Sequence, residues 1–88
     1  MITQHVKVTN ALGLHARAAA KFVQAASRFT CAVRVSAGER TMDGKSILGL
    51  LLLAVPRGSD LVILTEGPDE AEAADALAAL VVRGFDMP

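Results

Sequence analysis

The chain has no tryptophan or tyrosine, only three phenylalanines and a single cysteine, Cys31. One cysteine cannot form an internal disulfide, so the core must be stable without a cross-link, and a reducing, cytoplasmic location is expected. The scarcity of aromatic residues argues against a stacking surface for single-stranded nucleic acid. Nine basic residues balance nine acidic ones, and a neutral chain lacks the excess of lysine and arginine on which nucleic-acid binding mostly depends.

Long apolar runs are also absent. The longest nearly continuous stretch covers residues 47–55, whereas a helix needs about 20 apolar residues to span a bilayer, so no membrane insertion is expected. The first residues lack the basic segment and apolar run of a secretory signal. The two histidines lie far apart and no carboxylates cluster with them, so neither a metal site nor another cofactor is predicted.

Aliphatic residues are abundant: 52% of the 88 residues are hydrophobic, so residues 1–88 are predicted to form a single domain around one core. Periodicity and turn signals predict seven elements. They are a half-buried strand over 2–8, an amphipathic helix over 16–27, hairpin strands over 31–36 and 39–42, an apolar helix over 47–53, a strand over 61–65 and a helix after Asp69.

Four strands and three helices most economically form a two-layer α+β sandwich. The other face of an antiparallel sheet can be exposed to water. Here that face would carry Thr3, His5, Lys7, Arg34 and Ser36.

The last helix has local signals at both ends. Asp69 followed by Glu72 fits a capping box at its start. Gly84 suits the position just past its end, with Phe85 folding back onto the last turn. The predicted inward stripe is Ala73, Ala76, Leu77, Leu80 and Val81.

His15 lies between a loop that contains Gly13 and the first turn of the helix over 16–27. The unpaired N–H groups and the dipole of a helix start favour an anion, and Arg17 adds a cation nearby. A neutral imidazole nitrogen is a good nucleophile toward phosphorus near neutral pH. On the residues alone, His15 is either a phosphoryl acceptor or an ordinary surface histidine.

The stretch Asn10-Ala11-Leu12-Gly13-Leu14-His15-Ala16-Arg17 closely resembles the active-site signature of the HPr family, the histidine-containing phosphocarriers of the bacterial phosphoenolpyruvate-dependent phosphotransferase system. Lys45-Ser46-Ile47-Leu48-Gly49-Leu50 resembles the second signature of that family, and the resemblance covers nearly the whole chain. It implies an open-faced β-sandwich, in which three helices cover one face of a four-stranded antiparallel sheet in the order βαββαβα.

The same resemblance implies that His15 accepts a phosphoryl group on Nδ1 from phosphorylated enzyme I and passes it to IIA components, with Arg17 as the neighbouring cation. Such a protein is a transferase-like relay component rather than a free-standing enzyme, and it needs no cofactor of its own. The sequence departs from the family pattern at Ala18, where proline is usual. Alanine restores a backbone N–H there and removes a fixed φ angle, which predicts a looser helix start with one more donor.

Ser46 has two compatible interpretations. Its position before an apolar run predicts that its hydroxyl caps the second helix. Its match to the second signature resembles the regulatory site that HPr kinase/phosphorylase modifies in many members of the family. A phosphate at Ser46 would add nearly two negative charges to a docking surface.

The second helix is more apolar than one buried face requires, so some of Ile47, Leu48, Leu51 and Leu52 must face water. An exposed apolar patch usually marks a partner surface. The resemblance implies that enzyme I and IIA components dock there, with Arg17 and Lys21, joined by Lys45 and Arg28, facing acidic residues of the partner. A monomer is expected, and the alternative is a dimer formed through the same leucines.

Two alternatives of function stay open. One is a regulatory binding module that uses the same surface and has no role in sugar uptake. The other is a choice of branch: Gly84-Phe85-Asp86 is similar to the end of nitrogen-branch paralogues, whereas Lys45-Ser46-Ile47 is similar to members under kinase control.

Overall fold

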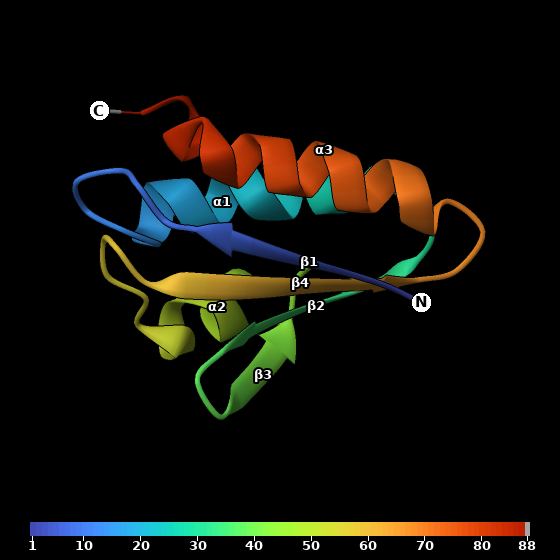
Figure 1. The fold of residues 1–88 in the computed structure, drawn as a ribbon, viewed down its shortest axis with the longest axis horizontal. Helices are drawn as coiled ribbons and strands as arrows, with labels where there is room; N and C mark the ends of the chain where they lie inside the picture. The colour runs from blue at the N-terminus through green and yellow to red at the C-terminus, as the bar shows by residue number, and fades with distance from the viewer. Residues whose placement is uncertain (88) are drawn as a thin grey trace.

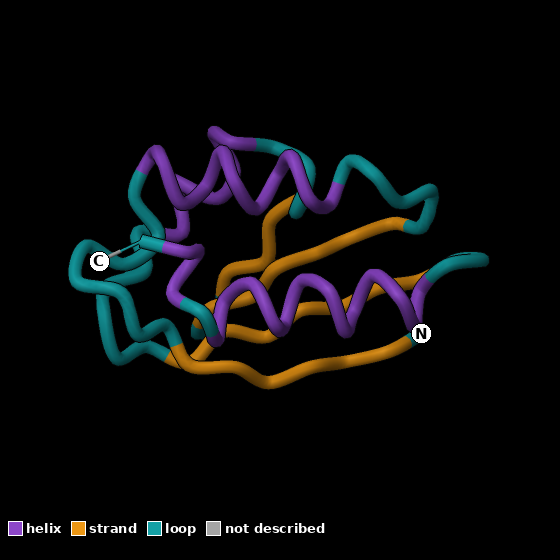
Figure 2. The backbone as a smooth tube through the Cα atoms, turned by 90° about the horizontal axis from the view of Figure 1, so that it is seen from above, coloured by secondary structure: helices purple, strands orange, loops and turns teal. Residues whose placement is uncertain are grey.

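A computed structural model describes residues 1–87 as one antiparallel sheet with helices on one face, in the predicted order. The strand order is β1-β4-β2-β3. The elements are β1 (Ile2–Lys7), α1 (Ala16–Ala26), β2 (Ala32–Ala37), β3 (Arg40–Asp43), α2 (Ile47–Leu53), β4 (Asp60–Glu66), α3 (Glu70–Val82) and a short 3-10 helix, η1 (Gly84–Asp86). Seen from above, the strands run side by side, α3 passes over them, and other helical segments lie to one side (Figure 2). The predicted open-faced α+β sandwich is confirmed.

Strand alternation decides which side chains enter the core. In β4, Leu61, Ile63 and Thr65 are buried, whereas Val62 and Leu64 between them are only half-buried. Each α-helix contributes at least one fully buried large residue to the same core, including Phe22 from α1, Leu50 from α2 and Leu77 from α3. Because side chains two residues apart share a sheet face, the helices cover the Leu61 face and leave the Val62 face open.

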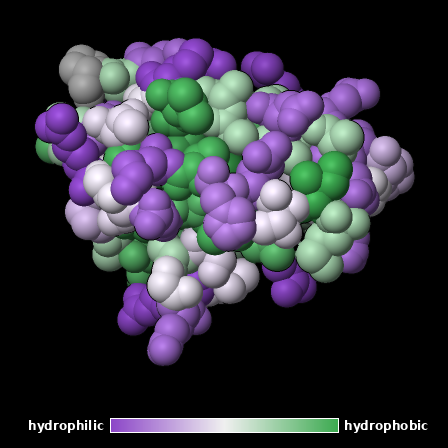
Figure 3. All heavy atoms as spheres, in the orientation of Figure 1, coloured by the Kyte–Doolittle hydropathy of each residue, from purple (hydrophilic) through white to green (hydrophobic). Residues whose placement is uncertain are grey.

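The open face is largely the one predicted. Thr3, His5, Lys7 and Arg34 are exposed. Ser36 is instead half-buried, because its hydroxyl lies in the β2–β3 hairpin and donates to the Arg40 carbonyl oxygen at 3.1 Å. Figure 3 views the molecule in the orientation of Figure 1 and shows hydrophilic residues spread over this surface, with smaller hydrophobic areas between them.

The predicted capping box at the start of α3 is wrong. Asp69 occupies the N-cap position but makes no side-chain cap bond. Its carboxylate accepts the N–H groups of Thr30 and Cys31, each at 2.9 Å, and so ties the start of α3 to the segment before β2. Glu70, rather than Glu72, reaches back: its Oε1 accepts the Gly67 N–H at 3.1 Å.

The clamp formed by Asp69 makes stability depend on pH. The Thr30 N–H, together with that of Cys31, lowers the pKa of the Asp69 carboxyl below its ordinary value because both stabilise the charged form. A group with a lowered folded-state pKa stabilises the fold above its unfolded-state pKa. The contribution of Asp69 is therefore present at neutral pH and is lost as the pH falls through the folded-state pKa.

The end of α3 follows the prediction, whereas its buried stripe differs in one residue. Gly84 has φ +66°, as a residue past a helix end often does, and Phe85 is completely buried. Ala76 is exposed, and Ala74 is buried in its place. The buried face of α3, which packs against β1 and β4, therefore includes Ala74 and not Ala76.

Ala54 provides a test of backbone strain at the end of α2. It is exposed and has φ +51°, a left-handed conformation that a Cβ disfavours and glycine does not. We expect Ala54→Gly to raise the free energy of unfolding by about 0.5–1 kcal/mol. Ala76→Gly is the matched control, since it places glycine at an exposed position inside α3 and should lower stability by about 0.5–1 kcal/mol. Denaturant unfolding measures both, and destabilisation by Ala54→Gly would contradict the strain.

Candidate functional site

His15 is the N-cap residue of α1. Its backbone is extended, with φ −78° and ψ 179°, and its Nδ1 accepts the Arg17 N–H at 3.3 Å. That bond needs the lone pair of Nδ1, so the neutral ring carries its proton on Nε2. The first helical bond runs from the Ala19 N–H to the His15 carbonyl at 2.8 Å. The Arg17 N–H of the first turn therefore lies beside the imidazole, outside the helical ladder.

The loop before His15 is held against the segment that follows α2. The Leu14 N–H donates to the Val55 carbonyl at 2.9 Å, and Val8 is bonded to Ser59 and Gly58 on the same segment. Gly13 has φ +65°, and a Cβ on it would lie 2.3 Å from the Val55 oxygen. Both the conformation and the close approach require glycine at this position.

Asn10 is the residue of this loop to which sequence reasoning assigned no role of its own. Its side-chain nitrogen donates to the Gly13 carbonyl at 2.7 Å, while the Gly13 N–H donates to the Asn10 carbonyl at 3.1 Å. The residue is 4% exposed, and its Oδ1 has no hydrogen-bond partner among residues 1–87. Asparagine before a Gly-containing turn was the available signal, since its side chain often bonds the local backbone.

Two of the predicted cations are exposed on α1. Arg17 and Lys21 are four residues apart, so they lie on one face of the helix. Neither forms a salt bridge within the part of the chain that the structure describes. Lys45 differs from the expectation: its ammonium group donates to the Phe29 carbonyl at 2.7 Å, so it stabilises the chain segment after α1 instead of facing outward freely.

The expected extra donor at position 18 does not reach the surface. Ala18 is completely buried, so its backbone N–H is closed to solvent. Its side chain instead belongs to the core cluster with Ala19 and Phe22. Alanine in place of proline therefore adds a backbone N–H at the start of α1. Because this N–H is buried, it does not contact an anion at the surface.

Ser46 caps α2, as predicted. Its hydroxyl oxygen accepts the Gly49 N–H at 3.0 Å. Asp43 holds the preceding turn, because its carboxylate accepts the Lys45 N–H at 2.9 Å and its carbonyl accepts the Ser46 N–H at 3.2 Å. Ser46 itself is half-buried.

The apolar surplus of α2 faces water. Leu50 and Leu53 enter the core, whereas the other four large residues are exposed. Their exposed fractions are 43% for Ile47, 67% for Leu48, 37% for Leu51 and 51% for Leu52. We call these four the α2 patch. Because α2 packs against α1 and Val55, two residues after the end of α2, is bonded to Leu14, the patch and the loop before His15 belong to adjoining parts of the surface.

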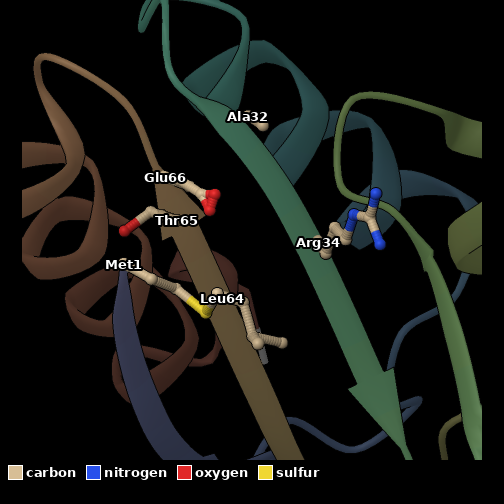
Figure 4. A pocket seen from close by; sticks show the side chains of 6 residues that line it. All are labelled: Met1, Ala32, Arg34, Leu64, Thr65 and Glu66. Atoms are coloured by element: carbon tan, nitrogen blue, oxygen red, sulfur yellow. The ribbon is translucent and has the colours of Figure 1, made fainter.

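A separate hollow on the open face of the sheet does not involve this site. It is lined by Met1, Ala32, Arg34, Leu64, Thr65 and Glu66 (Figure 4). None of these residues comes from α1, α2 or the loop between β1 and α1. Within residues 1–87 no three potential metal ligands cluster, and none of the helices is long and apolar enough to cross a membrane. His15 is half-buried and Arg17 is exposed, so the candidate reactive groups lie at the surface.

This fold, with a histidine at the start of α1, matches known proteins over almost its whole length. The family model described as "PTS HPr component phosphorylation site" matches residues 2–83. The phosphocarrier protein HPr of Cupriavidus necator is 46% identical over 85 residues, covering 97% of this chain and 96% of that protein. The crystal structure of HPr-C-His from Thermoanaerobacter tengcongensis has a TM-score of 0.95 at 38% identity, covering 100% of this chain and 99% of that chain. The chain belongs to the HPr family of phosphotransferase-system phosphocarriers.

A related protein with a different description is also similar. The Bacillus subtilis catabolite repression containing protein Crh is 43% identical with a TM-score of 0.77, covering 96% of this chain and 97% of that chain. Its crystal structure is described as an intertwined dimer with a swapped domain. The fold of this chain is therefore shared by proteins described as HPr and as Crh.

Proposed function

We propose that this protein relays a phosphoryl group in the phosphotransferase system, accepting it from phosphorylated enzyme I on His15 and passing it to IIA components. The observation that carries the proposal is the geometry of His15, whose Nδ1 lone pair faces the first turn of α1. Membership of a phosphocarrier family supports it. The relay acts in the cytoplasm, where the unpaired Cys31 stays reduced.

In the proposed transfer, the Nδ1 lone pair attacks phosphorus, and the bond between phosphorus and enzyme I breaks with its electron pair returning to enzyme I. The proton on Nε2 stays in place, so the reaction needs no general base to create the nucleophile. Once Nδ1 is bonded to phosphorus, the Arg17 N–H loses its acceptor and is available to a phosphoryl oxygen. The helix start and the Arg17 guanidinium favour the added negative charge.

Transfer to a IIA component is the reverse chemistry on a second partner. It requires that the phosphoryl group remain accessible, and His15 is only half-buried at the surface. Both partners would use the α2 patch for apolar contact and Arg17 and Lys21 for acidic groups. The protein acts as a monomer in this proposal, because a stable dimer through the patch would cover the docking surface.

The direct test is to incubate the protein with enzyme I and phosphoenolpyruvate and to look for an acid-labile, base-stable phosphate. We expect this phosphate in the wild type and its loss in His15→Ala. His5→Ala is the matched control, because His5 is the other histidine and lies exposed on the open sheet face. Absence of phosphohistidine in the wild type, or its persistence in His15→Ala, would rule out the proposed acceptor.

The similarity to Crh favours a second candidate function, a regulatory binding module with no role in sugar uptake. The two functions differ in their need for His15. Phosphoryl relay to IIA components requires it, whereas a module controlled only through Ser46 would still bind its target in the His15→Ala variant. The same variant therefore separates the two functions.

The α2 patch can be tested with two leucines of one helix. Leu48 is 67% exposed and Leu50 is fully buried. We expect Leu48→Asp to weaken binding to enzyme I about tenfold or more, because a carboxylate would be desolvated in the complex, while stability changes by about 0.5 kcal/mol or less. Leu50→Asp should lower stability by about 4 kcal/mol or more. Titration calorimetry and thermal unfolding measure these effects, and unchanged binding by Leu48→Asp would remove Leu48 from the docking surface.

For regulation, we propose that HPr kinase/phosphorylase modifies Ser46. The added charge would lie beside the α2 patch and oppose the acidic partners that Arg17 and Lys21 attract. We expect incubation with such a kinase and ATP to add one phosphate in the wild type and none in Ser46→Ala, as read by mass spectrometry. The modified protein should accept phosphate from enzyme I about tenfold more slowly or worse. An unmodified Ser46 would end this part of the proposal.

A further inference from the structure

Asn10 joins the start of the loop before His15 to its end. Its side-chain nitrogen donates to the Gly13 carbonyl at 2.7 Å, and the Gly13 N–H returns a bond to the Asn10 carbonyl at 3.1 Å. The two bonds close a ring over residues 10–13 that includes a side chain. Gly13 is followed by Leu14 and then by His15, so the direction in which the chain leaves this ring determines where the imidazole lies.

The contact between Asn10 and Gly13 is buried rather than part of an exposed turn. The residue is 4% exposed, and a Cβ on Gly84 would lie 3.4 Å from the Asn10 Cβ, so η1 packs over it. Figure 1 shows the loop after β1, the loop after α2 and the C-terminal segment at the same end of the molecule. Asn10 is therefore buried against Gly84, in a loop that lies at this end of the molecule.

The side chain of Asn10 uses only its nitrogen in hydrogen bonding among the described residues. A buried acceptor without a donor is unfavourable, and the Oδ1 atom has no partner among the described residues. Reversing the amide would place its oxygen against the Gly13 oxygen, so the orientation follows from the Gly13 bond alone. The favourable polar contact of this side chain is the bond from its nitrogen to Gly13.

We propose that Asn10 is a positioning residue for His15, holding the Gly13 carbonyl so that the imidazole Nδ1 stays at the start of α1. This inference rests on the proposed phosphoryl transfer to His15. Asn10 touches neither the imidazole nor a phosphoryl group, and it acts through Gly13 and Leu14. Without the amide, the loop keeps the Leu14 bond to Val55 and the backbone bond from Gly13 to Asn10 but loses the side-chain bond, and the imidazole samples more orientations.

The test compares Asn10→Ala and Asn10→Ser with Thr9→Ala, an exposed neighbour in the same loop. We expect both Asn10 variants to lower kcat for phosphoryl transfer from enzyme I about tenfold or more, because small misplacements of a reacting group are costly. The KM for enzyme I should stay within about twofold, since the docking surface is intact. Thr9→Ala should leave both constants unchanged. An unchanged kcat in the folded Asn10 variants would overturn the proposal.

A second measurement uses the unphosphorylated protein and is independent of the transfer reaction. Nuclear magnetic resonance should show faster hydrogen exchange of the Leu14 amide and a changed Nδ1 nitrogen shift of His15 in the Asn10 variants, with the Gly49 amide of α2 unaffected. If the wild type accepts no phosphate, the proposed function fails while this measurement still tests the positioning. Unchanged spectra at His15, or failure of both variants to fold, would make Asn10 a general structural residue and overturn the proposal.

Discussion

The site depends on one contact, the pairing of the loop after β1 with the segment after α2. The Leu14 N–H donates to the Val55 carbonyl, and the Gly58 N–H donates to the Val8 carbonyl at 2.7 Å. Gly13 approaches Val55 so closely that no other residue fits. The loop leads into α1 and the segment follows α2, so these bonds bring the start of α1 close to the end of α2. His15 and the α2 patch are brought together in the same way.

A transfer reaction at the protein surface explains why large apolar side chains are exposed on α2 and why His15 is not enclosed. A carrier must offer the same atom to two proteins in turn, so the reactive nitrogen cannot be sealed in a pocket. His15 is only half-buried, and the hollow on the open sheet face contains none of the proposed site residues. In the proposed transfer the partner has to exclude water, and we propose the α2 patch as the apolar surface for that contact.

Local sequence signals predicted most of the elements and the N-cap of α2, but not the contacts between distant segments. Periodicity and turn signals located the strands and α-helices of the described residues but not η1, and the position of Ser46 before an apolar helix predicted its capping role, because caps act within three residues. The cap bond that His15 accepts from the Arg17 N–H was not predicted. The Asp69 carboxylate looked like a local cap, whereas it binds the Thr30 and Cys31 N–H groups 39 and 38 residues away. The Lys45 contact with Phe29 was missed for the same reason.

The backbone is most strained where the site lies. Ala54, Phe85 and Asp86 have φ between +51° and +57°, although none is glycine, and each such conformation costs roughly 1–2 kcal/mol. Phe85 offsets its cost by complete burial, worth about 1.5–3 kcal/mol, and the Asp86 carboxylate accepts the Arg83 Nε–H at 2.9 Å. These residues adjoin Val55 and Gly84, which contact the loop before His15. Tertiary packing, rather than local preference, therefore holds this end of the molecule together, and the placement of His15 is a property of the whole fold.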